Sequence, residues 1–370
     1  MCKANTTDGL NLYLCPEFVI TRMFFAITVV VVGLPLNVIT IWAIWRYERP
    51  LNTQSVLVLN LCLNNVIFSG IVMPIVTADM WVVMDGPLCV PIGGLLLLCQ
   101  LSVIFAYLHI TLHRYFTVIL PQSHWITYGP PKKAALIVFL VFVPVFSHIM
   151  LALTGIWGLF HESPSTGTCT LARGIDGGDS TYNLLSMVIF LLVPVIIMSV
   201  CYAHILLFVR KKRRQICAQT QPVHQKDRQR IRREKRENRL TLIAMTTVIV
   251  FIITWIPYLA AQQLSALYDI VMFHAFAGAL VYIHAITDPL IYVIGAKQLR
   301  DHLRRLLAVF GIQQPVQPPN STSTVVQTEA NRVQEATKAI RSGSLLSGLL
   351  KVCLWQLKQK TITIHRATVF

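Results

Sequence analysis

The sequence has few charged residues and very few acidic ones. Asp, Glu, Lys and Arg make up 13% of its 370 residues, about half of the roughly 25% that is usual in soluble proteins. Hydrophobic residues make up 55%, and the mean hydropathy is +0.61. A disordered chain and a soluble enzyme with a charged surface are therefore excluded. The 16 acidic residues are outnumbered by 32 basic ones, so the formal net charge is +16.

Long apolar stretches account for this composition. A bilayer core about 30 Å thick needs roughly 20 apolar residues per helix. Seven stretches reach that length, and we predict spans at about 20–45, 54–78, 88–118, 134–157, 182–209, 240–266 and 271–294. The last is the weakest, because Asp288 interrupts it. The predicted fold class is an all-α membrane protein, a bundle of seven transmembrane helices.

Basic residues are almost missing from one side of this predicted bundle. Lys3, Arg22 and Arg173 lie on that side, and the other 29 of the 32 lie on the opposite side. Cytoplasmic loops carry the excess of Lys and Arg, so we predict an extracellular N-terminus and a cytoplasmic C-terminus in a multi-pass plasma membrane protein. The basic clusters between residues 210 and 239 are expected to contact anionic lipid and not nucleic acid.

The chain divides into a transmembrane domain and three segments outside it. We predict an extracellular N-terminus at 1–19, the transmembrane domain at 20–296, an amphipathic membrane-surface helix at 297–310 and a largely disordered cytoplasmic tail at 311–370. The amphipathic helix follows from leucines on one face and arginines on the other. The tail is rich in Pro, Ser and Thr at its start, and residues 339–357 are expected to form a helix on the membrane surface. Residues 1–17 lack an apolar core, so the first span is expected to act as an uncleaved anchor.

Three smaller features of the outer and terminal segments carry predictions. Cys89 opens the third span, and Cys169 is the sole cysteine of the 157–181 loop; because disulfides persist outside the cell, we predict that these two are bonded. Pairing of Cys2 with Cys15 is left open. Asn5 begins an Asn-Thr-Thr glycosylation sequon, and the chain ends in a Ser/Thr-x-apolar sequence that suits a PDZ protein.

Polar residues inside spans are expensive and are functional candidates. They occur in a fixed order: Gly33-Leu34-Pro35-Leu36-Asn37, Leu61-Cys62-Leu63-Asn64-Asn65, His113-Arg114-Tyr115, Pro194 with Tyr202, Phe251-Ile252-Ile253-Thr254-Trp255-Ile256-Pro257, and Asp288-Pro289-Leu290-Ile291-Tyr292. In order and spacing, these motifs resemble those of the class A (rhodopsin-like) G-protein-coupled receptors over residues 20–310. The resemblance implies an extracellular ligand, a heterotrimeric G protein, and arrestin and receptor kinases as further partners.

The same resemblance assigns roles to residues. Those expected to form the activation switch are His113, Arg114, Tyr115, Tyr202, Glu237, Phe251, Trp255, Pro257, Asn65, Asp288, Pro289 and Tyr292. Arg114 is a fixed cation near the membrane edge, and Glu237 is its expected ion-pair partner on another helix, which would give two alternative arrangements of the helix ends.

The chain departs from the family at several of these positions. His113 replaces the usual acid beside the arginine, so we expect raised signalling without ligand. Asn65 and Asp288 look exchanged relative to the usual acid and amide, and Cys99 and Val103 make an intrahelical sodium site doubtful. The fourth span has no tryptophan where the family usually has one.

The predicted ligand pocket lacks charge. Amine receptors of the family carry an Asp seven residues after the third-span cysteine, and Leu96 stands there. No Lys or Arg is expected at pocket level apart from Arg173 in a loop. The residues expected to contact the ligand are Leu96, Gln100, Ser186, Trp255, Tyr258, Gln262, Gly278 and Tyr282. A neutral lipophilic small molecule or lipid is favoured, and a peptide that contacts the acidic outer loops is the alternative.

Motifs for other functions are missing. We find no paired repeats of broken spans, which many transporters have, no catalytic cluster or Gly-x-Ser-x-Gly motif, and no pore loop. No enzyme activity, metal ligand or cofactor is therefore predicted. A seven-span transporter is kept as the least favoured alternative.

Overall fold

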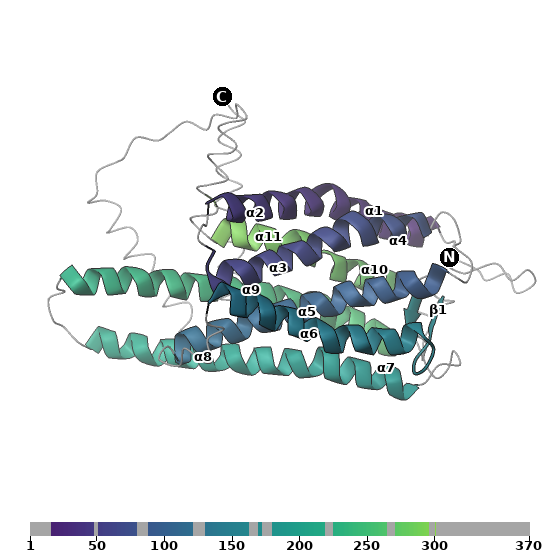
Figure 1. Cartoon of the computed structure of the whole chain (residues 1–370). Coiled ribbons are helices and arrows are strands. Elements are labelled where there is room, and N and C mark those ends of the chain that lie inside the picture. Colours follow the sequence, from purple (N-terminus) through teal and green to yellow (C-terminus); the bar gives the residue numbers. More distant parts are fainter. Residues whose placement is uncertain are drawn as a thin grey trace, which may run out of the picture. The chain divides into compact units, whose positions relative to one another are not determined.

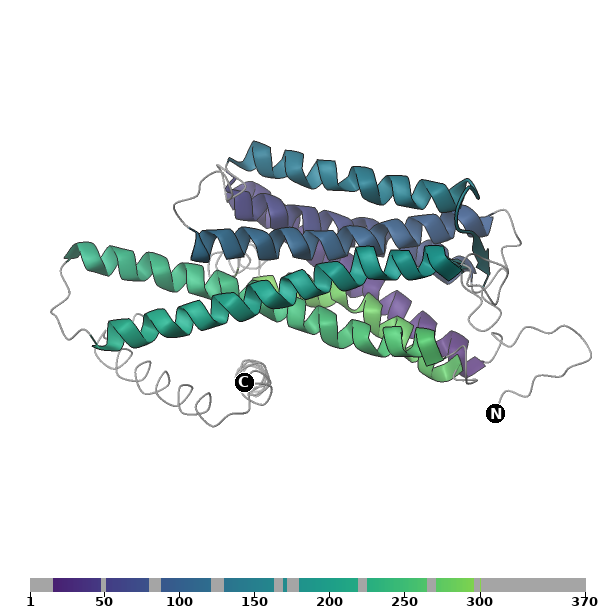
Figure 2. The ribbon, with the colours of Figure 1, turned by 90° about the horizontal axis from the view of Figure 1, so that it is seen from below.

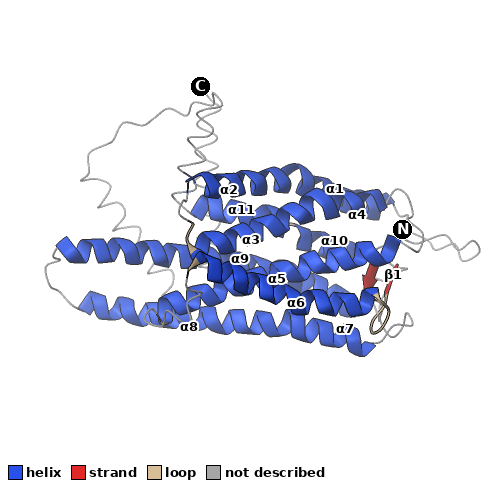
Figure 3. Cartoon of the chain, viewed as in Figure 1, coloured by secondary structure: helices blue, strands red, loops and turns tan. Residues whose placement is uncertain are grey.

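The computed structural model describes residues 16–47, 51–79, 88–120, 130–162, 169–171, 180–218, 225–264 and 271–295, together with Arg300. These residues are helical except for one β-hairpin and short turns (Figure 3). Several predictions fall outside them: the glycosylation sequon at Asn5, the pairing of Cys2 with Cys15, the amphipathic helix at 297–310 apart from Arg300, and the whole tail from residue 311.

Seven helices long and apolar enough to cross a membrane confirm the predicted bundle (Figure 1). Their elements are α1 (Pro16–Thr28), η2 (Val29–Gly33) and α2 (Leu34–Tyr47) in the first span; α3 (Thr53–Ile67), η3 (Phe68–Val72) and α4 (Met73–Asp79) in the second; α5 (Cys89–Ile119); α6 (Pro131–Leu153); α7 (Ser180–Met187), η6 (Val188–Leu192) and α8 (Val193–Ala218) in the fifth; α9 (Gln225–Leu264); and α10 (Val271–Tyr282) with α11 (His284–Gly295) in the seventh.

The third span is the centre of the bundle. α5 packs against α3, α6, α8 and α9, and polar side chains such as Arg114 and His109 are buried on it. Large apolar side chains instead face outward, for example Phe139 and Phe146 of α6. Polar side chains inside and apolar side chains outside suit a protein surrounded by lipid. Buried polar groups can form hydrogen bonds within the bundle, whereas lipid tails offer no hydrogen-bond partners to the outer face.

Three spans contain a wide π-helical turn, and each turn ends two residues before a proline. The turns η2, η3 and η6 precede Pro35, Pro74 and Pro194. In each, the residue just before the proline donates its backbone N–H five residues back: Leu34 to Val29, Met73 to Phe68 and Val193 to Val188. A proline ring clashes with the carbonyl of the preceding turn, and a wider turn makes room for it.

The fourth helix is shorter than predicted. The apolar pattern continues to residue 157, but α6 ends at Leu153. Gly155 has a φ of 69°, and the N–H of Trp157 donates to the carbonyl of Leu151 at 3.2 Å. A glycine with positive φ ends a helix and satisfies its last carbonyl groups in this way. The predicted boundary is therefore wrong, because hydropathy does not register the backbone conformation of a glycine.

A second glycine after α6 has no room for a side chain. Gly158 has a φ of 86°, and a Cβ there would lie 2.5 Å from the ring of Tyr182, whereas one at Gly155 would meet nothing within 4 Å. We expect Gly158→Ala to lower the free energy of unfolding by about 2–4 kcal/mol, from backbone strain plus overpacking. Gly155→Ala adds backbone strain without overpacking, so we expect it to lower the free energy of unfolding by about 1 kcal/mol. Thermal unfolding of the purified protein in detergent measures both; equal midpoints would contradict the packing at Gly158.

A short hairpin lies at one end of the bundle. β1 (Phe160–Glu162) pairs antiparallel with β2 (Cys169–Leu171), Phe160 opposite Leu171. Cys169 is bonded to Cys89 at the start of α5, as predicted, with 5.2 Å between the two Cα atoms. We call this the hairpin end. At the opposite end, where Arg114 lies, α8 and α9 extend beyond the other helices (Figures 1 and 2).

Candidate functional site

An ion pair joins two helices at the end opposite the hairpin. Arg114 of α5 donates from Nη1 to Oε2 of Glu237 of α9 at 2.8 Å. The arginine side chain is 1% exposed and the glutamate side chain is 36% exposed. The pair therefore has one desolvated partner and one that water reaches. Losing the carboxylate would leave a buried cation without its charge partner, which is unfavourable.

Aromatic hydroxyl groups surround this ion pair. Tyr202 of α8 and Tyr292 of α11 are buried, and Thr111, one turn before Arg114, donates to the hydroxyl of Tyr202 at 3.4 Å. Tyr115 is hydrogen bonded to His204 Nδ1 at 2.9 Å. The structure thus brings Tyr202, Glu237 and Tyr292, which the sequence assigned to the activation switch, near Arg114. Thr111 and His204 were not among the predicted switch residues.

A buried carboxyl group lies deeper in the bundle. Asp288 of α11 is 1% exposed. The hydroxyl of Tyr107 lies 2.8 Å from both of its oxygens, and Asn65 donates to Oδ2 at 3.1 Å. The exchange of Asn65 with Asp288 therefore preserves an amide–carboxylate contact between α3 and α11. About one turn before Asp288 on α11, the carbonyl of Ala285 accepts a hydrogen bond from Asn37 at 2.7 Å, which fixes α2 to α11.

Aromatic rings connect this carboxyl group to the middle of α9. The ring of Tyr107 lies 5.0 Å from that of Phe251, whose centroid is 5.3 Å from the centroid of Trp255. The ring centroid of Trp255 in turn lies 6.0 Å from that of Tyr258. Pro257 and Pro289 are inside α9 and α11. The rings form a continuous packed row from the hairpin half of the bundle to its buried carboxyl group.

The predicted ligand-contacting residues come from four spans, and the structure brings some of them together. Tyr258 stands against Gly278 of α10, where an added Cβ would lie 3.9 Å from the ring. Leu96 and Gln100 are half-buried on α5, and Tyr282 packs on Phe68. The side chain of Gln262 lies outside the described residues.

Ser186 has a different environment from the one predicted for a ligand contact. Its hydroxyl is hydrogen bonded to His148 Nε2 of α6 and to the carbonyl of Tyr182, both at 2.8 Å. The ring of His148 is stacked between Tyr182 at 4.7 Å and Phe190 at 4.4 Å. This group joins α6 to the fifth span. The sequence shows which polar residues a span contains, but it does not show which neighbouring helix each of them faces.

One basic residue lies inside a span near the hairpin end. Arg22 lies within the first span, Ile20–Arg46, as the predicted span at 20–45 implies, and its exposure is 6%. The expectation that pocket level has no Lys or Arg apart from Arg173 stays a prediction, because Arg173 lies outside the described residues. The guanidinium of Arg22 already interacts with another part of the protein, so it does not by itself create a free site for an anion.

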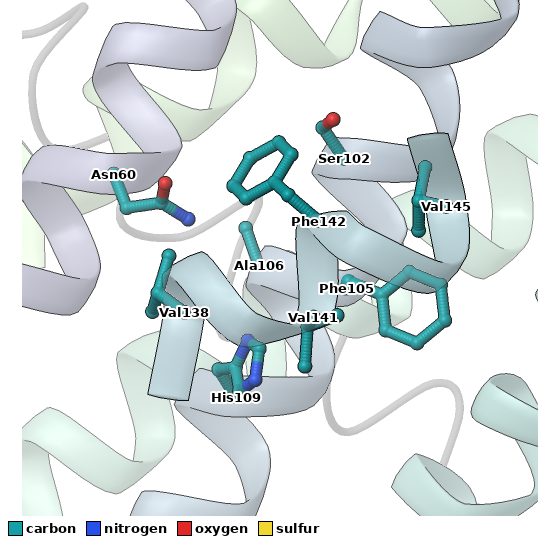
Figure 4. Close-up of a pocket in the computed structure, with 9 residues that line it drawn as sticks. All are labelled: Asn60, Ser102, Phe105, Ala106, His109, Val138, Val141, Phe142 and Val145. Atoms are coloured by element: carbon teal, nitrogen blue, oxygen red, sulfur yellow. The ribbon is translucent and has the colours of Figure 1, made fainter. Parts of the chain in front are cut away.

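A cleft opens between α3, α5 and α6. Figure 4 shows its lining, which is apolar on the α6 side and includes polar side chains from the other two helices. The lining residues are Asn60, Ser102, Phe105, Ala106, His109, Val138, Val141, Phe142 and Val145. None of them belongs to the eight residues predicted to contact a ligand. In the described part of the chain, no cluster of three His, Cys, Asp or Glu side chains could hold a metal ion.

Tyr107 and His148 are residues that the sequence analysis did not predict. Tyr107 provides two hydrogen-bond contacts to Asp288, yet it carries no charge and reads as an aromatic packing residue. The signal that was available is its position seven residues before Arg114, two helical turns along the same face of α5.

The comparisons with known proteins agree with this geometry. The model of the seven-transmembrane receptor (rhodopsin) family matches residues 36–292. Chemokine XC receptor 1 of Homo sapiens is 23% identical over 290 residues, which cover 74% of this chain and 77% of the relative. A green-sensitive opsin of Gekko gecko is 24% identical over 345 residues, 90% of this chain and 89% of the relative. Apelin receptor B of Danio rerio is 22% identical over 339 residues, 81% and 88% of the two chains.

The solved structure of squid rhodopsin has the same fold. Its TM-score is 0.68 over 81% of this chain and 89% of that chain, at 17% sequence identity. The family model covers more than half of the sequence: it contains the second to sixth spans in full, the end of the first span, and the seventh span up to Tyr292. The chain therefore belongs to the rhodopsin family of seven-transmembrane receptors.

Proposed function

We propose that the protein binds an extracellular ligand and activates heterotrimeric G proteins. The observation that carries this is the Arg114–Glu237 ion pair, which holds α5 and α9 together at 2.8 Å. A partner helix that competes for the arginine would release Glu237 and separate the two helix ends, and this gives the chain two alternative states. As a seven-span member of this family, the chain is a multi-pass plasma membrane protein.

The orientation we propose places the hairpin end outside the cell. The predicted outer side has three basic residues, and the side that holds Arg114 has the remaining 29. The Cys89–Cys169 disulfide at the hairpin end agrees with an oxidising surrounding. Arrestin, receptor kinases and a PDZ protein at Phe370 are further partners that we expect on the cytoplasmic side.

The ligand we favour is a neutral lipophilic small molecule or a lipid. Leu96 stands where a charged amine would need an acid, and a buried ammonium group without a counter-charge is strongly disfavoured. Arg22 of the first span is buried and already interacts with other groups of the protein. The predicted contacts around Tyr258, Trp255 and Gly278 are apolar and aromatic, which suits such a ligand.

A peptide ligand is the second candidate. The predicted outer segments contain several acidic residues, among them Asp85, Asp176 and Asp179, which would attract a basic peptide. Two relatives are named as receptors for a chemokine and for apelin, so these ligands belong in a test panel. Replacing Leu96 with Asp separates the candidates, because it should abolish the response to a buried apolar ligand and affect a surface-bound peptide less.

Arg114→Ala tests the receptor function. We expect ligand-stimulated nucleotide exchange on purified G protein to fall at least tenfold, because the cation that contacts the incoming helix is gone, while surface expression is retained since Glu237 is 36% exposed and stays hydrated. Lys132→Ala is the matched control, since it removes an exposed cation at the same end of the bundle. Exchange that is unchanged in Arg114→Ala, or solute flux without G-protein activation, would refute the receptor function and favour the transporter alternative.

A further inference from the structure

We propose that Tyr107 is a positioning residue of the activation switch. Its hydroxyl ties Asp288 of α11 to α5, and loss of this hydrogen bond raises receptor activity in the absence of ligand. The inference rests on the proposed receptor function and adds a residue, and a second interhelical contact, to the Arg114–Glu237 ion pair.

The geometry of the hydroxyl group is the first support. It lies 2.8 Å from Oδ1 and 2.8 Å from Oδ2 of Asp288, and both side chains are 1% exposed. The neutral amide of Asn65 also donates to this carboxyl group, at 3.1 Å. Within the described residues, no Lys or Arg forms an ion pair with Asp288. A carboxyl group buried in a span depends on its hydrogen-bond donors, so the hydroxyl of Tyr107 stabilises α11 in this position.

The ring of Tyr107 supplies a second, independent link. It packs on Phe251 of α9 with centroids 5.0 Å apart and planes at 53°, and Phe251 packs on Trp255. The carbonyl of Tyr107 accepts from Thr111, whose hydroxyl also reaches Tyr202 of α8. One residue of α5 therefore contacts side chains of α9 and α11 directly and α8 through Thr111. These are the helices that carry the predicted switch residues.

The hydrogen bond belongs to the same state as the ion pair. Arg114 and Glu237 are in contact in this structure, so the Tyr107–Asp288 bond is present while α5 and α9 are held together. A contact made in one of two states and weakened in the other favours the first state by that difference. Removing the hydroxyl group alone should therefore shift the population toward the active state by about tenfold, as expected for one hydrogen bond to an acidic group.

A purely structural role for Tyr107 makes a different prediction. If the side chain only fills space, Tyr107→Phe keeps the ring and leaves activity unchanged. Tyr182 offers a matched control, because it is also buried and its hydroxyl donates to the carbonyl of His148 at 2.6 Å. That hydrogen bond joins α6 to α7 and touches no residue of the predicted switch.

The experiment compares full-length variants in lipid nanodiscs with purified G protein. Ligand-free nucleotide exchange should rise about tenfold in Tyr107→Phe and stay within twofold of the parent in Tyr182→Phe. Asp288→Asn replaces the carboxyl group that accepts this hydrogen bond. The exchange rate of the double variant Tyr107→Phe/Asp288→Asn, relative to the parent, should therefore be smaller than the product of the two single-variant increases. Unchanged or lowered exchange in Tyr107→Phe would overturn the proposal, as would an equal rise in Tyr182→Phe.

A second readout does not depend on the G protein. Ile243 of α9 is 5% exposed and packs against Gly295 of α11, so the rate at which an Ile243→Cys side chain reacts with a thiol reagent reports separation of these helices. Adding Tyr107→Phe to that variant should speed the reaction several-fold. If labelling accelerates while no variant activates a G protein, the contact stands and the proposed coupling fails. If labelling does not accelerate, the inference about Tyr107 fails whatever the G-protein result.

Discussion

Replacing Glu237 with Gln is expected to raise G-protein activation in the absence of ligand about tenfold. Gln keeps the shape and a hydrogen-bond acceptor but removes the negative charge that faces Arg114 at 2.8 Å. A fully buried pair would lose 3–5 kcal/mol, and because Glu237 is 36% exposed we expect about 1.4 kcal/mol, which corresponds to tenfold. Nucleotide exchange on the G protein at equal surface expression measures the effect.

A second variant is expected to have the opposite effect on ligand-free G-protein activation. His113 stands directly before Arg114, in a position where an acid would provide the arginine with another counter-charge. We expect His113→Asp to lower ligand-free exchange below that of the parent, and to reduce the rise caused by Glu237→Gln when the two are combined. If Glu237→Gln leaves exchange at the parent level, the ion pair does not restrain the inactive arrangement.

Loss of the disulfide between Cys89 and Cys169 is expected to lower both the stability and the surface expression of the protein. The bond closes a loop of 80 residues, for which chain entropy predicts about 4 kcal/mol. Since the third and fourth spans stay in the membrane on unfolding, part of that entropy is never gained, and we expect about 2–4 kcal/mol. Cys89→Ser should lower the melting temperature by about 5–10 °C and reduce surface expression.

The control for this loss is a cysteine without a bond. Cys201 of α8 is free and buried, so Cys201→Ser removes a thiol of similar burial and closes no loop. Its melting temperature should stay within about 3 °C of the parent. A Cys89→Ser variant as stable as Cys201→Ser would mean that the hairpin holds its place by packing alone, through contacts such as Phe160 against Gly93.

The sequence predicts the seven spans because hydropathy and length are properties of each segment by itself. The end of the fourth helix at Leu153 was missed, since it depends on the positive φ of Gly155. Asp288 was read as an interruption of the seventh span. In the structure it accepts hydrogen bonds from Tyr107 and Asn65, so α11 continues through it.

Contacts in the site could be predicted where both residues of the contact belong to recognisable family motifs. Arg114 and Glu237 were expected as partners from the resemblance to the receptor family, and the structure places them in contact. Tyr107 could not be derived in the same way, because its partner Asp288 is 181 residues away and the pairing depends on how α5 and α11 pack. Ser186 shows the same limit: its position in a span is evident, but its neighbour His148 belongs to another helix.

The three wide turns before Pro35, Pro74 and Pro194 have a consequence for helix length. A π-helical turn holds one residue more than an α-helical turn, so each of these spans carries one surplus residue at a known place. Deleting a single residue within Val29–Gly33, Phe68–Val72 or Val188–Leu192 would return the turn to α-helical geometry and leave the side-chain faces before and after it in their present orientation. The same deletion elsewhere in a span would rotate every later residue by about 100°. Single-residue gaps between this chain and its relatives are therefore most readily accommodated at these three turns.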